Sequence, residues 1–329
     1  MLDKQKIRFG LVGAGGGISK RRGSAILENP DSEVTLICET DENKWEKLKE
    51  KYNVKITKDY REVVSSPEVD AVAISTPNIF HYEIIKEALK NGKHTVSEYP
   101  MVQNLAQYDE LVKLAEGKKV VLHDGLTPRL EIQHKTIMNN LPRFGRLMSA
   151  NYRYFAEGVN GWYWNPKLAG DFFCTCHMHF IDYQMAFFGE VESIYATKYM
   201  LQKECREIKT GYAVMKFKNG IYSVIEFGVG FTSASPNTLL VTGEQGYIEY
   251  RGDEHAMKFS GKTDKEGYFE IELPKVDTFA ETLKEDTNLF IDEILGRRKP
   301  VVDSKLGREI LRITLLASES AETGKVIKT

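Results

Sequence analysis

The sequence has few of the features that mark secreted or membrane-spanning proteins. Its four cysteines among 329 residues are too few for a disulfide framework and favour reduced thiols. The first six residues, MLDKQK, lack the apolar stretch of a secretory signal. No run approaches the ~18 apolar residues that a membrane-spanning helix needs. We therefore expect a cytoplasmic protein with no membrane partner.

Charge of one sign is also scarce. Lysine and arginine number 45 against 47 acidic residues, a formal net charge of -2. Nucleic acids select clustered basic residues, and the longest basic runs here are only residues 20–22 and 297–299. The chain shows no internal repeat, and 42% of its residues are hydrophobic, as in globular proteins. We expect a small-molecule partner and no nucleic acid.

A chain of 329 residues exceeds what one hydrophobic core usually supports, so two domains are expected. The first 123 residues alternate short apolar stretches with amphipathic helical ones, which is typical of a parallel sheet covered on both faces. The predicted strands are residues 7–12, 34–38, 71–75, 95–98 and 120–123. Residues 1–123 are therefore predicted to form an α/β domain.

The pattern changes after about residue 146. Longer alternating segments joined by tight turns, such as Asn219-Gly220, indicate an antiparallel sheet. The predicted strands are residues 147–155, 193–198, 210–218 and 221–231, and the predicted helices are residues 171–188, 278–295 and 305–323. Residues 124–329 are predicted to form an α+β domain with a large, mostly antiparallel sheet, whose last helix can pack back on the first domain.

The first strand runs directly into a cluster of glycines, Gly13-Ala14-Gly15-Gly16-Gly17. Glycines at this point let the backbone approach a pyrophosphate and turn into a helix whose N-terminal amides face the anion. A strict G-x-G-x-x-G would place its third glycine at Ile18. The cluster is therefore either a dinucleotide-binding turn with altered spacing or a plain structural turn.

Glu39 ends the second strand, 24 residues after Gly15. An acidic residue near this position binds the ribose hydroxyls of the adenosine in dinucleotide-binding domains. Its charge would repel a 2'-phosphate, and the next residue, Thr40, offers no compensating cation. NAD(H) is therefore predicted rather than NADP(H). The alternative is that Glu39 only caps the following helix together with Asp41.

A longer pattern begins with Thr76-Pro77-Asn78, continues with His81 and residues 92–94 (Gly-Lys-His), and ends with Glu98-Tyr99-Pro100. It resembles the Gfo/Idh/MocA oxidoreductases, in which T-P-N, G-K-H and E-K-P occur in this order. The resemblance implies a Rossmann-type domain followed by a substrate-binding and oligomerisation domain, with a homodimer or homotetramer by analogy. It also implies that Thr76, Pro77, Asn78 and Glu98 line the nicotinamide-ribose side of the cofactor, with His81 nearby.

Tyr99 stands where the family has a catalytic lysine. A lysine would present a cation to a nascent alkoxide, whereas a phenol with a pKa near ~10 is neutral and only exchanges hydrogen bonds. Tyr99 therefore either holds a substrate oxygen or simply packs in the place of the lysine. Biliverdin reductases, relatives with the same fold, also carry tyrosine there.

A second motif, residues 169–182, resembles the G-G-x-x-x-D-x-G-x-H-x-x-D segment of the same family. His179 and Asp182 are in register, and the first aspartate falls on Thr175. On a continuous helix these three residues share one face. Histidine titrates near pH ~6.5, so His179 is predicted to act as general acid or base. Asp182 either orients its imidazole or belongs to a surface ion pair.

The same helix contains possible zinc ligands, namely Cys174, Cys176, His177 and His179. A helix would scatter them around its axis, so no metal is predicted. Aromatic side chains before the helix either wall a substrate pocket or form core. The substrate-binding candidates are Arg129, Tyr152, Trp162 and Trp164.

Three functions remain open from the sequence. The first is hydride transfer between NAD(H) and a small polyhydroxylated or carbonyl substrate, of sugar or cyclitol type. The second is reduction of a conjugated C=C or C=N bond, as in biliverdin reduction, where a neutral tyrosine suffices because no alkoxide forms. The third is dinucleotide binding without catalysis by a regulator, since Tyr99 and Thr175 replace two catalytic residues of the family.

Overall fold

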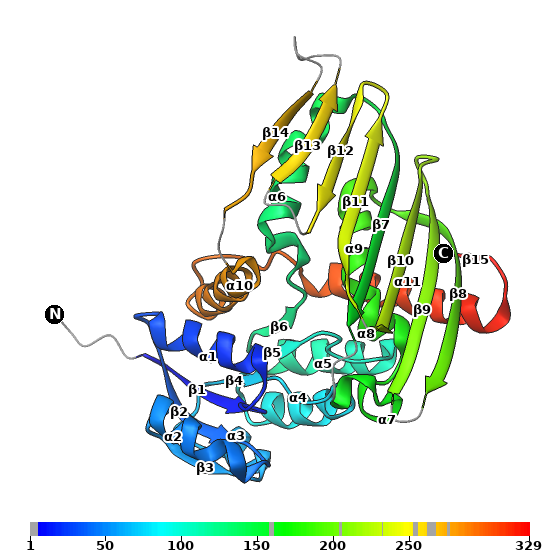
Figure 1. Cartoon of the computed structure of the whole chain (residues 1–329). Coiled ribbons are helices and arrows are strands. Elements are labelled where there is room, and N and C mark those ends of the chain that lie inside the picture. The colour runs from blue at the N-terminus through cyan, green and yellow to red at the C-terminus, as the bar shows by residue number, and fades with distance from the viewer. Residues whose placement is uncertain are drawn as a thin grey trace. The chain divides into compact units, whose positions relative to one another are not determined.

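Six parallel strands form the first sheet in the order β3-β2-β1-β4-β5-β6 (Figure 1). The chain is described here from a computed structural model that covers residues 6–157, 161–203, 206–231, 233–252, 256–261, 268–274 and 277–329. The strands are β1 (Ile7–Val12), β2 (Ser32–Cys38), β3 (Lys55–Thr57), β4 (Ala71–Ile74), β5 (His94–Glu98) and β6 (Leu122–Gly125). This sheet confirms the predicted Rossmann-type architecture.

Helices cover both faces of the first sheet, and the alternation of β1 decides which helix packs on which face. Phe9 and Leu11 join one core cluster with residues of α1 (Gly17–Glu28), α2 (Trp45–Tyr52) and α10 (Thr278–Ile294). Gly10 points the other way, because a Cβ built on it would lie 2.3 Å from Val63 Cγ1 of α3 (Tyr60–Ser65). The helices α4 (His81–Lys90) and α5 (Leu105–Lys118) follow α3 in this layer.

The return of α10 to the first sheet is the main feature of this unit. Phe290 of α10 is fully buried and its ring lies 5.9 Å from that of Phe9 and 5.5 Å from that of His123. The contacts of the chain accordingly divide it into one unit of residues 1–127 with 279–308 and another of residues 128–278 with 309–329. The first unit therefore needs a segment that follows most of the second in sequence.

The second unit contains one large sheet with the strand order β14-β13-β12-β11-β7-β10-β9-β8-β15 among the described residues. Its strands are β7 (Leu147–Glu157), β8 (Val191–Lys203), β9 (Arg206–Phe217), β10 (Tyr222–Phe231), β11 (Ser235–Gly243), β12 (Gly246–Arg251), β13 (Ala256–Gly261), β14 (Tyr268–Glu272) and β15 (Ile327–Lys328). Neighbours pair antiparallel except β7 and β10. The sheet is thus mostly antiparallel, as predicted.

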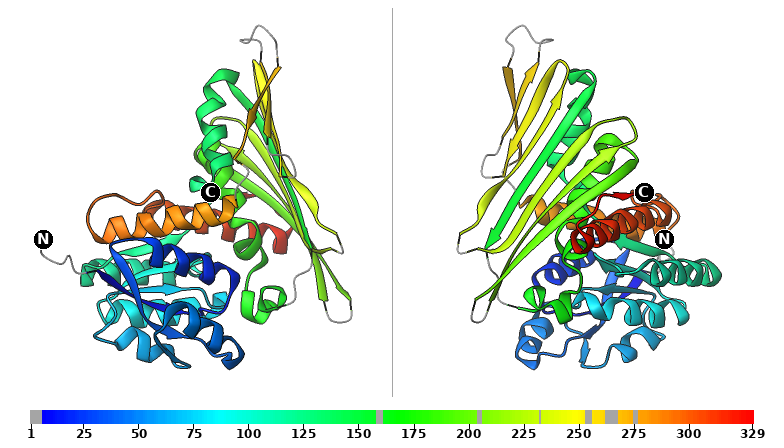
Figure 2. Two further views of the ribbon diagram at one scale, coloured as in Figure 1. Left: turned by 60° about the vertical axis from the view of Figure 1, so that its left-hand side comes forward. Right: turned by 90° about the vertical axis from the view of Figure 1, so that its right-hand side faces the viewer.

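Helices of the second unit cover one face of this sheet (Figure 2). They are α6 (Ile132–Asn140), α7 (Pro166–Ala169), α8 (Phe172–Cys176), α9 (Met178–Phe188) and the greater part of α11 (Ser304–Thr323). In β10 the inward Ile225 and Phe227 are buried, whereas the outward Tyr222 is 53% exposed. This alternation is the physical basis of the sequence pattern. Within the described ranges, no helix has the length and apolar character of a membrane span.

The predicted helix over residues 171–188 is wrong in one respect, because it is not continuous. It is divided into α8 and α9 by His177, whose backbone leaves the helix as a turn. The His177 ring is fully buried, with the rings of Phe173 and Phe227 at 4.6 and 5.5 Å. Packing of this ring into the aromatic core accompanies the break, and such tertiary contacts are not visible in helical periodicity.

Candidate functional site

The glycine cluster forms a tight turn between β1 and α1. Gly13 has φ of +83°, and a Cβ on it would lie 2.7 Å from the backbone oxygen of Ser75 at the end of β4. A Cβ on Gly15 would lie 2.4 Å from Glu39 Oε2. Gly13 requires glycine because of its positive φ and the neighbouring Ser75 backbone. At Gly15 a side chain would have to displace the side chains of Glu39 and Lys44.

Helix α1 begins at Gly17, with Gly16 as its N-cap residue. Within the described residues no side chain caps this end, and the first turn contains no acidic residue. The first-turn amides of a helix lack intrahelical acceptors and carry a partial positive charge. Gly16, Gly17 and Ile18 therefore provide backbone donors suited to a pyrophosphate.

Glu39 lies against the glycine turn and is only 7% exposed. Its Oε2 accepts a hydrogen bond of 2.6 Å from the amide of Gly15, and its Oε1 accepts one of 2.9 Å from the amide of Asp41. Both interpretations of Glu39 thus find support, since it braces the next turn and also presents a carboxylate at the cofactor turn. The sequence did not indicate Lys44, whose side chain lies directly over Gly15.

Thr76 and Asn78 follow β4 at the same edge of the sheet. The Cγ2 of Thr76 would lie 3.1 Å from a Cβ on Gly13, and its Oγ1 is buried without a partner among the described residues. His81 is fully buried, and its two ring nitrogens lie 2.9 Å from the backbone oxygen of Thr76 and 3.0 Å from that of Pro100. Burial lowers the pKa of His81, so the neutral ring donates a hydrogen bond to one of these two oxygens and packs against the other.

A buried ionic network that the sequence did not indicate lies behind Glu98. Arg22 of α1 donates to Glu98 Oε1 from Nε (2.9 Å) and Nη2 (2.7 Å), and to Asp286 Oδ2 of α10 from Nη1 (2.7 Å). His123 bonds to Asp286 Oδ1 (3.0 Å) and Glu293 Oε1 (2.8 Å). Arg22 stood out only as part of a short basic run, because its partners lie up to 264 residues away.

These contacts change the ionisation of the network. Burial alone would lower the pKa of His123, but the carboxylates of Asp286 and Glu293 outweigh it and raise that pKa to about 10. Burial would raise the pKa of Asp286, but His123 and Arg22 lower it to about 2. Burial raises the pKa of Glu98, against the opposing effect of Arg22. At neutral pH His123 is therefore a cation.

The residues at this edge fit a nicotinamide dinucleotide. The uncapped start of α1 suits the pyrophosphate, and Glu39 is placed to accept from hydroxyls beside Gly15. The buried Oγ1 of Thr76 lacks a partner that a polar ligand could supply. Several hydrogen-bond donors and acceptors at the carboxyl ends of the strands are therefore available to a cofactor.

In the second unit, Thr175 and Asp182 have protein partners. Thr175 is 3% exposed and its hydroxyl donates to the backbone oxygen of Ala169 at 3.0 Å. Asp182 is fully buried, and its Oδ1 accepts bonds of 2.8 Å from Nε and Nη2 of Arg129. Of the two roles open to Asp182, the structure thus shows an ion pair, buried rather than at the surface.

His179 lies on α9, three residues before Asp182. Burial lowers the pKa of His179 to about 3, so its imidazole is neutral at neutral pH. A second bond beside the Arg129–Asp182 pair links the same segments, because the hydroxyl of Tyr183 donates to the carboxylate of Glu131. Burial raises the pKa of Glu131 to about 7. Two side-chain bonds therefore fix α9 against the segment before α6.

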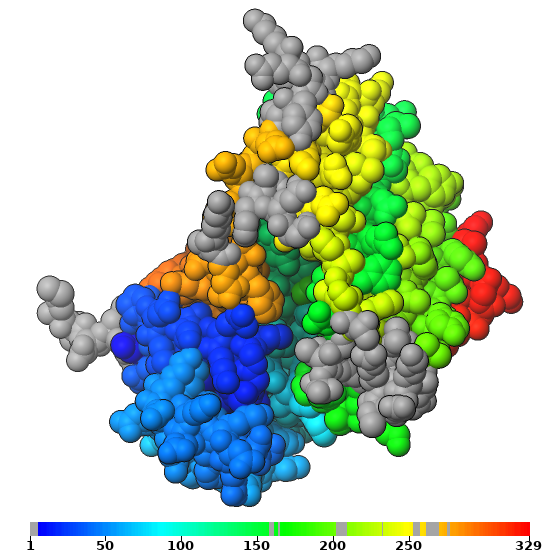
Figure 3. Space-filling view, in the orientation of Figure 1, coloured from blue at the N-terminus to red at the C-terminus, as the bar shows by residue number. Residues whose placement is uncertain are grey.

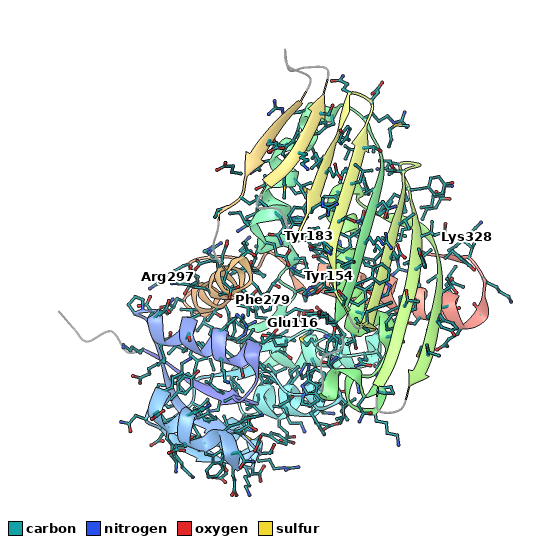
Figure 4. The ribbon with its side chains drawn as sticks, viewed as in Figure 1. Glu116, Tyr154, Tyr183, Phe279, Arg297 and Lys328 are labelled. Carbon is teal, nitrogen blue, oxygen red and sulfur yellow. The ribbon has the colours of Figure 1, made fainter. Side chains whose placement is uncertain are left out.

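The aromatic candidates lie mainly in the core. Tyr152 is 5% exposed, its ring lies 4.3 Å from that of Phe180, and its hydroxyl accepts from Asn237. Tyr154 and Tyr183 also lie between the sheet and α9 (Figure 4). Trp162 is half-buried against Tyr163, and the side chain of Trp164 lies outside the described residues. Tyr152 therefore supports the wall of any pocket rather than its surface.

The cysteine and histidine cluster does not converge. Cys174 and Cys176 are buried, the hydroxyl of Tyr163 lies 3.9 Å from Cys176 Sγ, and His177 Nε2 faces the backbone oxygen of Gly211. Across the described parts of the chain, no group of three His, Cys, Asp or Glu side chains is arranged to hold a metal ion.

Comparison with known proteins identifies the architecture. Residues 7–126 match the model of the oxidoreductase family with the NAD-binding Rossmann fold, and residues 143–249 match the GFO/IDH/MocA C-terminal domain. The chain belongs to the Gfo/Idh/MocA oxidoreductases. It is an NAD-binding oxidoreductase, and the resemblance drawn from its motifs is confirmed.

Three similar proteins cover nearly the whole of this oxidoreductase. Myo-inositol 2-dehydrogenase of Thermotoga maritima is 25% identical over 98% of each chain. D-glucoside 3-dehydrogenase of Escherichia coli is 24% identical over 98% of this chain and 97% of its own. The structure of biliverdin reductase from Synechocystis sp. PCC 6803, with biliverdin and NADP+, has a TM-score of 0.87 at 21% identity, covering 96% of this chain and 99% of that one. This last likeness shows the fold alone.

The ionisation of His123 predicts how the stability of this oxidoreductase depends on pH. A histidine with a pKa raised from ~6.5 to about 10 on folding contributes stability that is complete below pH ~6.5 and is lost as the pH rises through 10. We expect the unfolding free energy of the wild type, measured by urea titration, to decrease as the pH rises from ~6.5 to about 10. The variant His123→Gln should lack the part of this decrease that comes from His123.

The control is His94, whose pKa burial lowers instead. In the wild type, His94 makes the unfolding free energy increase as the pH rises towards ~6.5, whereas His123 makes it decrease at higher pH. The variant His94→Gln should lose this increase. Parallel pH curves for the wild type and His123→Gln would show that His123 is not protonated in the folded protein.

Proposed function

We propose that this oxidoreductase transfers a hydride between NAD(H) and a small polyhydroxylated or carbonyl substrate of sugar or cyclitol type. The observation that carries the proposal is the neutral, half-buried His179 on the same helix as Asp182 of the Arg129–Asp182 pair. A neutral imidazole accepts the proton that an alcohol loses on oxidation. The curated relatives, a cyclitol dehydrogenase and a glucoside dehydrogenase, act on substrates of this kind and match this chain over its full length.

The chain's own residues would divide the chemistry in a simple way. When bound, the nicotinamide supplies the hydride acceptor or donor. His179 takes the hydroxyl proton, and Asp182 with Arg129 keeps the helix that carries it in place. Tyr99 binds the substrate oxygen through a neutral hydrogen bond, which stabilises an alkoxide less than the lysine of the family would.

Variants of His179 test this assignment. His179→Ala should abolish turnover while the dissociation constant for NADH, measured by fluorescence, stays unchanged. Because a base with a pKa of about 3 is already deprotonated at pH 5, kcat/KM for oxidation should not fall between pH 8 and 5. The control His94→Gln should keep full activity. Turnover by His179→Ala at the wild-type rate would remove His179 from the mechanism.

Reduction of a conjugated C=C or C=N bond is the second candidate. Tyr99 favours it, because a neutral phenol suffices when no alkoxide forms, and the fold match with biliverdin reductase is in keeping with it. Incubation with NADH and panels of inositols, sugars, carbonyl compounds and tetrapyrroles separates the two candidates. Failure to consume cofactor with any of them would favour the third candidate, a regulator.

For the cofactor, we propose NAD(H) over NADP(H), since the carboxylate of Glu39 at the Gly15 amide would face a 2'-phosphate. Glu39→Gln keeps an acceptor for Gly15 but removes the charge. We expect this variant to bind NADPH at least about tenfold more tightly, a change of ~1.4 kcal/mol, with NADH affinity changed less. Fluorescence titration measures both constants.

The control for this experiment is Lys44→Met, because Lys44 also lies over Gly15. Lys44→Met should weaken the binding of NADPH more than that of NADH if the ammonium of Lys44 faces the 2'-position of the ribose. A wild-type protein that binds NADPH more tightly than NADH would contradict the preference.

The uncovered face of the second sheet supports a homodimer or homotetramer. Exposed aromatic and apolar side chains on this face are Tyr195, Tyr199, Tyr212, Tyr222, Leu240 and Tyr247, and this face, green to yellow, is turned to the viewer in Figure 3. A sheet face with several exposed aromatic side chains and no helix over it is a candidate interface.

The oligomer proposal predicts a clear result in sedimentation velocity. The double variant Tyr212→Glu, Tyr222→Glu should sediment as a monomer, because two buried charges without partners oppose association. The control Leu27→Glu changes an exposed residue of α1 and should leave the assembly intact. A wild-type monomer at micromolar concentration would contradict the proposal.

A further inference from the structure

The segment Glu98–Pro100 is held from both sides of Tyr99. Before Tyr99, the side chain of Glu98 accepts two hydrogen bonds from Arg22 at 2.9 and 2.7 Å. After Tyr99, the backbone oxygen of Pro100 lies 3.0 Å from His81 Nδ1. The residue that departs from the family pattern is thus flanked by two buried anchors.

Arg22 is a rigid anchor because its other side is bound to α10. It is 1% exposed, and its Nη1 donates to Asp286 Oδ2 at 2.7 Å and to Thr287 Oγ1 at 3.3 Å. A guanidinium is a planar fork that fixes two carboxylates at once, which a lysine cannot do. Glu98 is thereby held at a fixed distance from α10.

The position of Asp286 is fixed in turn by His123 of β6. His123 bonds to Asp286 Oδ1 and to Oε1 of Glu293, which lies about two helical turns further along α10. The network therefore contains two cations, Arg22 and His123, and three carboxylates, with side-chain exposures between 2% and 10%. In a buried network of this kind, the hydrogen-bond partners fix the position and orientation of each charged side chain.

The second anchor, His81, is equally constrained. Its ring is fully buried, and its Nε2 lies 2.9 Å from the backbone oxygen of Thr76 while Nδ1 faces Pro100. The imidazole thus lies between the end of β4 and the turn after β5, and its single N–H donates to one of the two oxygens. His81 contacts the backbone after Tyr99, and Arg22 binds the side chain before it.

We propose that Arg22 and His81 are positioning residues that form a clamp on Tyr99, through Glu98 and Pro100 respectively. The clamp sets the direction in which the Tyr99 phenol points, without contacting substrate itself. The proposal rests on the proposed function only in that Tyr99 binds a substrate oxygen. A neutral hydrogen bond depends more strongly on geometry than a point charge does, so a site that uses tyrosine gains from such a clamp.

The test uses Arg22→Met, Arg22→Lys and His81→Phe in the full chain. The matched control is Arg8→Met, since Arg8 forms a comparable pair with Asp70, with Nε–Oδ2 and Nη2–Oδ1 distances of 2.9 and 2.8 Å, on the same sheet. Steady-state kinetics and NADH fluorescence give kcat, KM and the cofactor dissociation constant. A single 3-fluorotyrosine at position 99 gives a ¹⁹F signal that reports on the phenol without any turnover.

Arg22→Met and His81→Phe should lower kcat by about 10- to 100-fold, the scale of an ångström-sized misplacement, while KM and NADH affinity change less than about threefold. Their ¹⁹F signals should shift and broaden. Arg22→Lys keeps the charge but not the fork, so its values should lie between those of the wild type and Arg22→Met. Arg8→Met should match the wild type in every measurement.

A ¹⁹F signal and kcat in the clamp variants equal to those of Arg8→Met would overturn the clamp. Should Arg22→Met fail to fold, Arg22→Lys and His81→Phe decide by the same criteria. If the wild type turns over no substrate of the panels, the proposed function fails, but the ¹⁹F signals still decide whether Arg22 and His81 hold Tyr99.

Discussion

The buried charge of Arg22 is the constraint on which the first unit depends. A guanidinium that is 1% exposed must be paired on every side, and leaving its carboxylates unpaired would cost about 3–5 kcal/mol. Its partners come from β5 and from α10, 76 and 264 residues away. The buried ion pairs therefore tie the first sheet to α10, although most of the second unit precedes α10 in the chain.

The parallel arrangement explains why so many functional candidates meet at one edge. The carboxyl ends of the parallel strands meet at the same edge of the sheet, so Gly13, Thr76 and Glu98 lie at the edge where we propose that the cofactor binds. At this edge Tyr99 stands where the family has a lysine, so a neutral phenol takes the place of a cation. The segment Glu98–Pro100 that contains it is anchored through Glu98 by Arg22.

In the second unit, the short helix α9 packs against one face of the large sheet and is held there by side-chain contacts. Aromatic rings fill the layer between β7, β10 and α9, and His177 interrupts the helix where its ring enters that layer. Arg129 and Glu131, from the segment before α6, bind Asp182 and Tyr183 of this helix. Residues of the predicted catalytic motif therefore also form structural hydrogen bonds. The hydroxyl of Thr175, for example, donates to the backbone oxygen of Ala169.

The sequence by itself determined the family, the parallel sheet and the larger antiparallel sheet, because hydrophobic period and turn residues are local properties of the chain. It also located Gly13, Gly15, Glu39 and Thr76, since each follows directly from a strand end. Only the tertiary structure decided that Arg22 and His123 form a network with Asp286, that Asp182 pairs with Arg129, and that the His81 ring lies between two backbone oxygens. These partners lie between 5 and 264 residues apart, and no periodicity records which distant side chains a fold brings within hydrogen-bond distance.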